Sequence, residues 1–227
     1  MTRFLNSEMV KASKTIRNNI KNGNGLPRSI KMIDTDGKVH TVEKKYYNGL
    51  FESRNVFTLK NGRMPNYVTL NQTANNPLVL NYQDDKYSCC VASFNMCVQM
   101  LYDWIPESKI KKLFKTNQYG TSPANMVAGA KALGYKVEQI GRNFSSVQKA
   151  ISKGFPVLTH YETAGKTKPK CVGFIQNYGH YGMIYGVTKD GYYLFADPTK
   201  GLKKCTPKEL DYATNGRSLG YYMVGLV

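Results

Sequence analysis

Four residues of this chain have the types and the order that thiol catalysis needs. Such catalysis requires a nucleophilic thiolate, a base for its proton, and donors for the oxyanion formed at the attacked carbonyl. Cys89 starts a predicted helix after Ser88, where free backbone N–H groups favour a negative charge on sulfur. We expect His180 to be the base, Asp197 to orient it, and Gln83 to donate to the oxyanion beside the Cys89 N–H.

Two predicted strands bring the histidine and the aspartate together. Residues 181–189 and 191–196 are rich in β-branched and aromatic side chains, and Asp190-Gly191 between them is a strong hairpin signal. His180 then opens the first strand and Asp197 ends the second, so both lie near the same edge of a sheet.

The other predicted elements indicate an α+β domain, with helices first and an antiparallel sheet afterwards. Ser88 is expected to cap the first helix, and Pro123 lies in the first turn of the third. The helices are predicted over residues 89–104, 108–114, 122–133 and 145–153, and the further strands over residues 155–161 and 219–226.

The five cysteines predict free thiols in a reducing compartment, because their number is odd and no CxxC pair occurs. Cys90 is the rival nucleophile beside Cys89. Cys97, Cys171 and Cys205 are expected to be small buried side chains. The chemistry needs a reduced thiol but no cofactor, and whether a divalent cation is required stays open.

Several polar and aromatic residues are candidates to line a substrate site. His160 ends a predicted strand and is the rival base, although no Asp-Pro follows it on a paired strand. Asp34 and Asp36 fall short of a calcium-binding set, so no metal site is predicted. The candidate lining residues are Asp84, Asp85, Cys90, Thr121, Ser122, His160, Tyr178 and Tyr181.

A weak internal repeat occupies the first third of the chain. Residues 25–32 resemble residues 63–70 at an offset of 38 residues (65 minus 27), and each copy follows a predicted helix, over 7–21 or 44–60. We therefore expect a helical-repeat binding module over residues 1–75, with units at about 1–38 and 39–75, followed by a catalytic domain over 76–227. The alternative is a chance likeness between two helix–turn–strand connections.

The composition predicts a globular protein with an anionic partner. The net charge is +17, from 32 basic and 15 acidic residues, which suits nucleic acid, anionic lipid or an acidic wall polymer. No apolar run reaches the roughly 20 residues that span a bilayer, so membrane insertion is not expected. The N-terminal stretch lacks the apolar core of a secretory signal, which predicts synthesis in the cytoplasm.

Over residues 78–227 the motifs resemble the papain-like superfamily, especially its bacteriocin-processing and pseudomurein-cleaving branches. The resemblance implies a papain-like fold with Cys89, His180 and Asp197 as the triad, and the Gln83 spacing favours Cys89 over Cys90. The motifs are Gln83-x5-Cys89, Ala92-Ser93, Gly179-His180-Tyr181, Ala196-Asp197-Pro198-x-x-Gly201, Gly120-Thr121-Ser122-Pro123 and Leu133-Gly134-Tyr135-Lys136.

Residues 61–68 are similar to the pseudomurein-binding repeat of the pseudomurein endoisopeptidases of methanogen viruses and proviruses. This resemblance implies hydrolysis of the alanine–ε-lysine isopeptide bond in archaeal wall cross-links, with host lysis after release to the wall. It implies wall binding through Pro27, Pro65, Asn66 and Tyr67, although Arg28-Ser29 departs from the repeat in the first copy. We expect a monomer.

Two alternatives stay open at this point. One is a papain-like peptidase that acts on protein or on bacterial peptidoglycan, against which the repeats argue. The other is a non-catalytic protein that binds the wall or nucleic acid. Nucleic-acid binding has only the charge in its favour, since no recognisable motif accompanies the basic residues.

Overall fold

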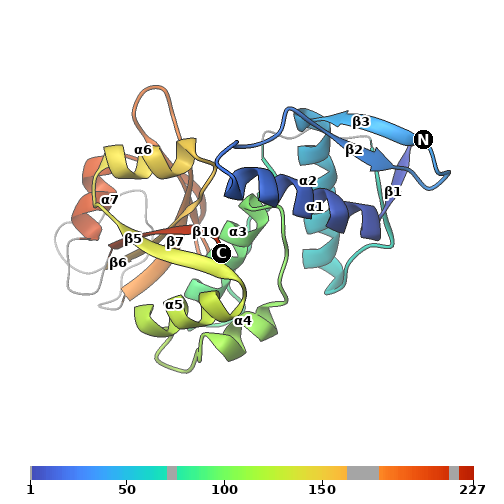
Figure 1. Ribbon diagram of the computed structural model, residues 1–227. Coiled ribbons are helices and arrows are strands. Elements are labelled where there is room, and N and C mark those ends of the chain that lie inside the picture. The colour runs from blue at the N-terminus through green and yellow to red at the C-terminus, as the bar shows by residue number, and fades with distance from the viewer. Residues whose placement is uncertain (1, 71–75, 163–178, 215–219) are drawn as a thin grey trace. The chain divides into compact units, whose positions relative to one another are not determined.

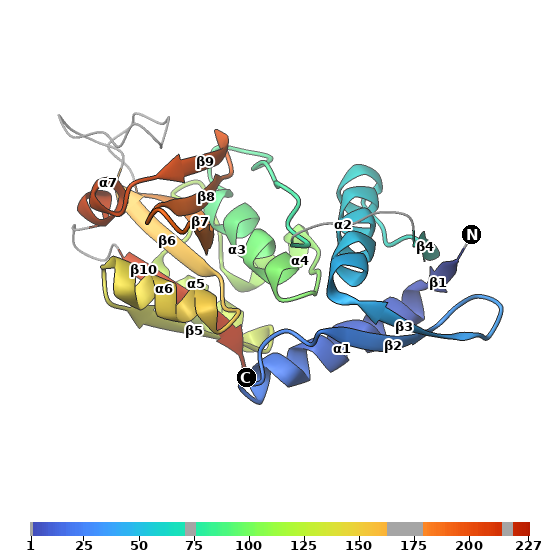
Figure 2. The ribbon, with the colours of Figure 1, turned by 90° about the horizontal axis from the view of Figure 1, so that it is seen from above.

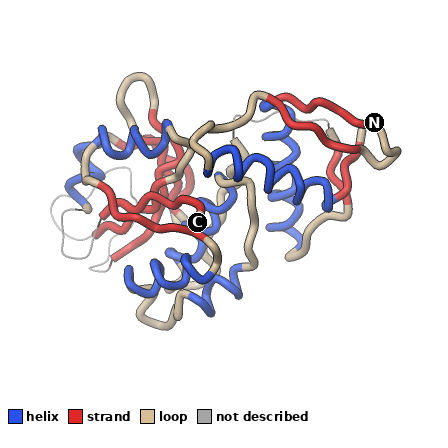
Figure 3. Tube along the Cα trace, viewed as in Figure 1, coloured by secondary structure: helices blue, strands red, loops and turns tan. Residues whose placement is uncertain are grey.

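The computed structural model describes residues 2–70, 76–162, 179–214 and 220–227. The chain forms two compact units, one of Met1–Val79 with Val98–Trp104 and one of Leu80–Cys97 with Ile105–Val227. Figure 1 labels most of their helices and strands, and Figure 3 separates the two kinds of element by colour. The predicted division after residue 75 stays a prediction. No helix in the described ranges combines the length and apolarity that a membrane span needs.

The first unit consists of two β–α–β segments. One segment is β1 (Arg3–Leu5), α1 (Asn6–Lys21) and β2 (Ser29–Ile33), and the other is β3 (Val39–Glu43), α2 (Lys44–Asn61) and β4 (Tyr67–Thr69). The helices begin 38 residues apart, at Asn6 and Lys44, and so do β2 and β4, at Ser29 and Tyr67. The 38-residue sequence repeat therefore corresponds to a repeated piece of structure.

The strands of the two copies are exchanged. β1 of the first copy pairs antiparallel with β4 of the second, while β2 pairs antiparallel with β3. The Asn6 N–H donates to the Asn66 carbonyl at 3.0 Å, and the equivalent Lys44 N–H donates to the Arg28 carbonyl at 2.8 Å. Each two-stranded ribbon therefore contains one strand from each copy.

The expectation of a helix–turn–strand unit is incomplete, because a strand also precedes each helix. β1 is only three residues long and β3 five, which is too short for the alternation of apolar and polar residues to be clear. The two predicted helices are confirmed within one residue at each end.

The core of the first unit includes the residues that follow α3 (Cys89–Met100). Tyr102 is buried and packs edge-on against Phe51, with ring centroids 5.2 Å apart. Its hydroxyl donates to Asn48 Oδ1 at 2.7 Å. The helix predicted to reach residue 104 ends at Met100, and Tyr102 has a left-handed φ of 60°. The left-handed residue Tyr102 lies in the turn directly after the helix. The helix thus ends several residues before Ile105-Pro106, where a proline would have stopped it.

The second unit contains a six-stranded antiparallel sheet in the order β5-β10-β6-β7-β8-β9, which Figure 2 shows from β9 at one edge to β5 at the other. Gly191, with a φ of 82°, lies in the predicted hairpin turn between β7 and β8. The strands are β5 (Tyr135–Ile140), β6 (Val157–Glu162), β7 (Gly179–Val187), β8 (Tyr193–Asp197), β9 (Gly201–Cys205) and β10 (Gly220–Leu226).

Helices cover both faces of this sheet. Residues of α6 (Phe144–Ser152) and α7 (Pro207–Ala213) form a core with Tyr161, Ile184 and Phe195 on one face. Tyr181 and Tyr222 lie close to Cys90 of α3 on the other face. Side chains along a strand point alternately to the two faces of the sheet. His180 and Ile184 are four residues apart on β7, so the His180 side chain lies on the same face as that of Ile184. The remaining helices are α4 (Glu107–Leu113) and α5 (Pro123–Ala132).

The α+β architecture is confirmed, and three elements of this unit were not predicted. The apolar residues show no strong periodicity in β5, β9 and α7. In β9, two lysines occupy middle positions of the strand. The expectation of free thiols is wrong for Cys205, which is disulfide-bonded. Cys89, Cys90 and Cys97 are free, whereas Cys171 lies outside the described residues.

Candidate active site

Cys89 is the first residue of α3, as the sequence predicts. The Ala92 N–H donates to the Ser88 carbonyl at 2.9 Å, so Ser88 occupies the N-cap position of the helix. The Ser88 hydroxyl accepts a hydrogen bond from the Asp85 N–H at 3.3 Å, which ties the preceding loop to the helix start. The Cys89 sulfur therefore lies beside free backbone N–H groups, where a negative charge is favoured.

His180 and Asp197 come together at the ends of neighbouring strands. His180 is the second residue of β7 and Asp197 the last residue of β8. His180 Nε2 lies 3.4 Å from Asp197 Oδ1, and the His180 side chain also hydrogen-bonds with Cys89. The structure thus brings together the three residues singled out in the sequence, from one helix and two strands.

Asp197 is fully buried and surrounded by hydrogen-bond donors. Oδ2 accepts from the Tyr161 hydroxyl at 2.8 Å, and Oδ1 accepts from the backbone N–H groups of Thr199 and Lys200 at 2.7 and 3.0 Å. Burial alone would raise the pKa of this carboxyl, but the bonds from His180 and Thr199 outweigh it, so the pKa lies well below its ordinary value. Asp197 is therefore a carboxylate at neutral pH.

The neighbours of His180 favour its protonated form. Burial by itself lowers the pKa of the imidazole, but the hydrogen bonds to Asp197 and Cys89 outweigh burial and raise the pKa to about 9. Tyr161 stands edge-on to the ring, with centroids 5.4 Å apart, and limits its movement. At pH 7 the site can therefore hold an imidazolium next to the Cys89 sulfur.

The two adjacent thiols differ in access. Cys89 is 8% exposed and Cys90 is 0% exposed. Burial, together with the neighbouring Cys89, raises the pKa of the Cys90 thiol well above its ordinary value, although a hydrogen bond with Thr121 opposes the rise. Cys90 therefore behaves as a core side chain, and Cys89 is the thiol that a substrate can reach.

Gln83 lies in the loop before α3, and its backbone N–H donates to the Pro198 carbonyl at 3.0 Å. This bond holds the loop beside the turn that follows Asp197. Its side-chain Nε2 donates to the Asp85 carbonyl at 2.6 Å, which uses one of the two amide hydrogens. The second hydrogen is the one an oxyanion would need.

Asp84 and Asp85 are exposed residues of the same loop. Asp85 accepts from the Tyr87 N–H at 2.8 Å and pairs with Lys111 of α4 at 3.0 Å, so its carboxylate shapes the loop. Asp84 has a longer contact of 3.8 Å with the same lysine. Of the two side chains, Asp84 is the more exposed, although it also hydrogen-bonds with Glu107.

The rival base His160 lies on the face of the sheet opposite His180. His160 pairs directly across from Tyr181, and the two rings stack with centroids 4.2 Å apart. A Cβ atom at Gly179 would lie 2.4 Å from His160 Nε2, so a larger residue there would displace this ring. Tyr181 is 2% exposed and donates to the Thr121 carbonyl at 3.2 Å. Tyr178 lies outside the described residues.

Thr121 and Ser122 have structural contacts at the start of α5. Thr121 is buried, and its hydroxyl hydrogen-bonds with the Thr116 hydroxyl at 2.7 Å. Ser122 is exposed, and its hydroxyl caps α5 by accepting from the Asn125 N–H at 3.2 Å. Within the described ranges, no cluster of three or more His, Cys, Asp or Glu side chains is placed to hold a metal ion.

Two partners of the site were not anticipated. Thr199 follows Asp197 by two residues, a spacing at which Asp commonly accepts from the backbone ahead, so its local sequence held a signal. Tyr161 reaches Asp197 only because β6 pairs with β7, which places Tyr161 opposite His180. That contact depends on strand register, which the sequence alone does not specify.

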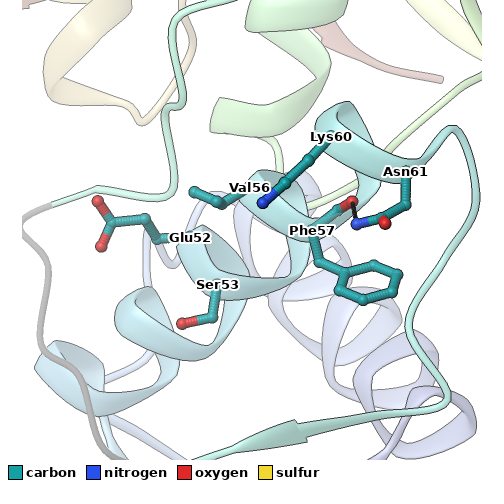
Figure 4. A pocket seen from close by; sticks show the side chains of 6 residues that line it. All are labelled: Glu52, Ser53, Val56, Phe57, Lys60 and Asn61. Carbon is teal, nitrogen blue, oxygen red and sulfur yellow. Dashed lines mark hydrogen bonds between the residues drawn. The ribbon is translucent and has the colours of Figure 1, made fainter.

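The candidate wall-binding residues lie in the first unit. Pro27 is half-buried and its carbonyl accepts from the Tyr47 hydroxyl at 2.6 Å, while Pro65 is buried. Asn66 and Tyr67 are exposed, at the start of β4. Figure 4 shows a separate shallow hollow on α2, lined by Glu52, Ser53, Val56, Phe57, Lys60 and Asn61.

The fold and the cysteine, histidine and aspartate just described define a papain-like cysteine peptidase. The chain belongs to the Peptidase C39 family, whose sequence profile matches residues 75–213. No curated protein sequence matches the chain.

Two solved structures are similar to this chain in fold. The peptidase domain of Streptococcus ComA, a bi-functional ABC transporter involved in quorum sensing, is 18% identical with a TM-score of 0.51, over 65% of this chain and 98% of that one. A putative C39-like peptidase from Bacillus anthracis is 14% identical with a TM-score of 0.50, over 64% of this chain and 94% of that one.

Proposed function

We propose that this cysteine peptidase hydrolyses the alanine–ε-lysine isopeptide bond of pseudomurein cross-links and thereby lyses methanogen cells. The observation that carries the substrate assignment is the duplicated first unit, whose second copy has the sequence similar to pseudomurein-binding repeats. A papain-like site linked to such a unit suits a cross-linked wall polymer. The net charge of +17 suits a polymer rich in carboxylates.

The first half of the proposed reaction forms a thioester. The Cys89 sulfur attacks the alanine carbonyl carbon, and the Cys89 N–H and the Gln83 amide donate to the resulting oxyanion. The C–N bond then breaks as His180 transfers its proton to the departing lysine ε-amine. Asp197 keeps the imidazole ring oriented and stabilises its positive charge.

The second half returns the enzyme to its starting state. His180, now neutral, takes a proton from water while the water oxygen attacks the thioester carbon. The C–S bond breaks and alanine leaves as a carboxylic acid, whose proton passes through solvent to the released amine. The proton taken from water stays on His180 beside the Cys89 thiolate. Across both halves one water is consumed, and one carboxyl and one amine are released.

We assign the proposed wall contact to the outer face of the β1–β4 ribbon. Leu5 and Tyr67 are exposed and directly opposite each other in register, and the Arg3 guanidinium lies 4.8 Å from the centre of the Tyr67 ring. An aromatic ring beside a cation suits sugars that carry carboxylates. Asn66, also exposed, adds an amide at the edge of this face.

The corresponding positions on the β2–β3 ribbon are Thr41, Glu43 and Ser29, at the same 38-residue offset from Arg3, Leu5 and Tyr67. These three positions lack the aromatic ring beside a cation that Arg3 and Tyr67 form on the β1–β4 ribbon. We therefore propose one wall-binding face, to which both copies contribute a strand.

The test is incubation of the purified protein with isolated pseudomurein under reducing conditions, with turbidity and newly freed ε-amines as readouts. Loss of turbidity together with new ε-amines is expected, and Cys89→Ala protein is expected to produce neither. Bacterial peptidoglycan and casein serve as comparison substrates. If the protein cleaves either of these but not pseudomurein, it is a peptidase with a different substrate, and the proposal is wrong.

A further inference from the structure

We propose that Thr199 is a positioning residue of the active site, whose hydroxyl links the imidazole ring of His180 to the carboxylate of Asp197. This inference rests on the proposed roles of His180 and Asp197, but not on the identity of the substrate. Thr199 lies in the turn of residues 198–200, between β8 and β9.

The distances favour the hydroxyl over the direct contact. Thr199 Oγ1 lies 3.2 Å from His180 Nε2 and 2.7 Å from Asp197 Oδ1. The direct hydrogen bond between His180 Nε2 and Asp197 Oδ1 is longer, at 3.4 Å, than a typical N–H···O bond. The Thr199 hydroxyl is therefore the nearer of the two oxygens to His180 Nε2, and it is itself hydrogen-bonded to the carboxylate.

Asp197 Oδ1 also has little capacity left for the ring. It already accepts the Thr199 hydroxyl, the Thr199 N–H and the Lys200 N–H, all at 3.0 Å or less. A carboxylate oxygen offers about two lone-pair sites, and three donors already use them. His180 Nε2, the fourth donor at 3.4 Å, therefore makes only a weak hydrogen bond to this oxygen. His180 therefore depends on the hydroxyl for its closer hydrogen bond.

The chemistry of the groups fixes the direction of both bonds. Asp197 is ionised and can only accept, so the Thr199 hydroxyl donates its proton to Asp197 Oδ1. The hydroxyl oxygen then accepts a hydrogen bond from the His180 Nε2–H group. With Nε2 so engaged, Nδ1 is the ring nitrogen left for Cys89. Thr199 thus selects the tautomer and the orientation that catalysis needs.

The experiment measures how fast iodoacetamide alkylates Cys89 between pH 5 and pH 10, by mass spectrometry, with Cys89→Ala protein as the blank. Thr199→Val removes the hydroxyl while keeping the shape, and Thr199→Ala is a second variant without it. Thr199→Ser keeps the hydroxyl. Thr188→Val is the matched control, since Thr188 is a half-buried turn threonine that accepts from the Tyr192 N–H at 3.0 Å, at the opposite end of the strands.

We expect alkylation at pH 7 to slow roughly tenfold or more in Thr199→Val, as for the loss of a hydrogen bond to a charged group. The His180-dependent step in the profile, near pH 9, is expected to move to lower pH. Thr199→Ser and Thr188→Val should keep both the rate and the step. Circular dichroism confirms that each variant is folded.

Two results would overturn the assignment. One is a Thr199→Val or Thr199→Ala profile that matches Thr188→Val at every pH. The other is a Thr199→Ser protein as slow as Thr199→Val, because the hydroxyl would then not be the group that matters. Since alkylation needs no wall substrate, neither result depends on whether the protein cleaves pseudomurein.

Discussion

The two units of this protein organise their surfaces in opposite ways. In the second unit one sulfur, one imidazole and one carboxylate converge from α3, β7 and β8, each of them at least nine-tenths buried. In the first unit a β–α–β segment occurs twice, and its two ribbons differ in the residues that face outward. A catalytic site built from three side chains loses most of its activity when one functional group is removed. A binding surface made of several exposed side chains loses affinity gradually.

The largest difference is expected within the converged site, between two neighbouring thiols. Cys89→Ala should lower kcat/KM by roughly a thousandfold or more, because the nucleophile is gone. Cys90→Ala should change kcat/KM only slightly and lower the melting temperature, because Cys90 is a fully buried side chain. The measurement is release of ε-amines from pseudomurein alongside thermal unfolding. The reverse pattern would make Cys90 the nucleophile.

The pH profile tests the charge state of His180. Its pKa is raised to about 9, because the hydrogen bonds to Asp197 and Cys89 outweigh burial. Proton transfer to the departing amine needs the imidazolium, so kcat/KM should fall about tenfold for each pH unit above 9. A raised pKa also contributes to stability fully below pH 6.5, and this contribution is lost as the pH rises through about 9.

Activity measured from pH 5 to pH 10.5, with recovery on return to pH 7 as the control for unfolding, checks this expectation. A reversible alkaline limb that sets in at pH 7 would show that the imidazole is held neutral. The ion pair of imidazolium and thiolate would then have to be abandoned.

A smaller effect is expected from the support of Asp197. Tyr161→Phe removes the donor to Asp197 Oδ2 and should lower kcat/KM roughly tenfold. The matched control is Tyr193→Phe, since Tyr193 is also a buried tyrosine that donates to a carboxylate, Asp211 Oδ1 at 3.2 Å, away from the site. Both variants should lose stability, but only Tyr161→Phe should lose activity. Equal kcat/KM values would reduce Tyr161 to a core residue.

The sequence predicted which side chains meet at the candidate site of the second unit, because they belong to a few short motifs. Cys89 after a capping serine, and His180 and Asp197 on either side of an Asp-Gly turn, could be placed from residue types and spacing alone. Tyr161 could not be placed, because its contact with Asp197 needs the register between β6 and β7. Thr199 was within reach, as it is only two residues from Asp197.

The first unit was harder to predict, because one of its strand pairs joins strands that are far apart in the sequence. The offset of 38 residues identified the repeat, and the spacing of apolar residues identified both helices. β1 pairs with β4, so the first and last strands of the first unit lie side by side. No residue pattern within either copy indicates this pairing. The disulfide at Cys205 was missed because an odd cysteine count argued against any pairing.

The smallest effect is expected on the repeat surfaces, where it also tests whether the two ribbons differ in function. Tyr67→Ala should weaken binding of Cys89→Ala protein to isolated pseudomurein severalfold, while Ser29→Ala, at the equivalent position of the other ribbon, should leave it unchanged. Sedimentation with washed walls at two salt concentrations measures both. Raising the salt should weaken binding of every variant, since Arg3 and the positive net charge act through screened attraction. Equal losses from the two alanine variants would mean that both ribbons bind, and no loss from either would place the contact elsewhere on the unit.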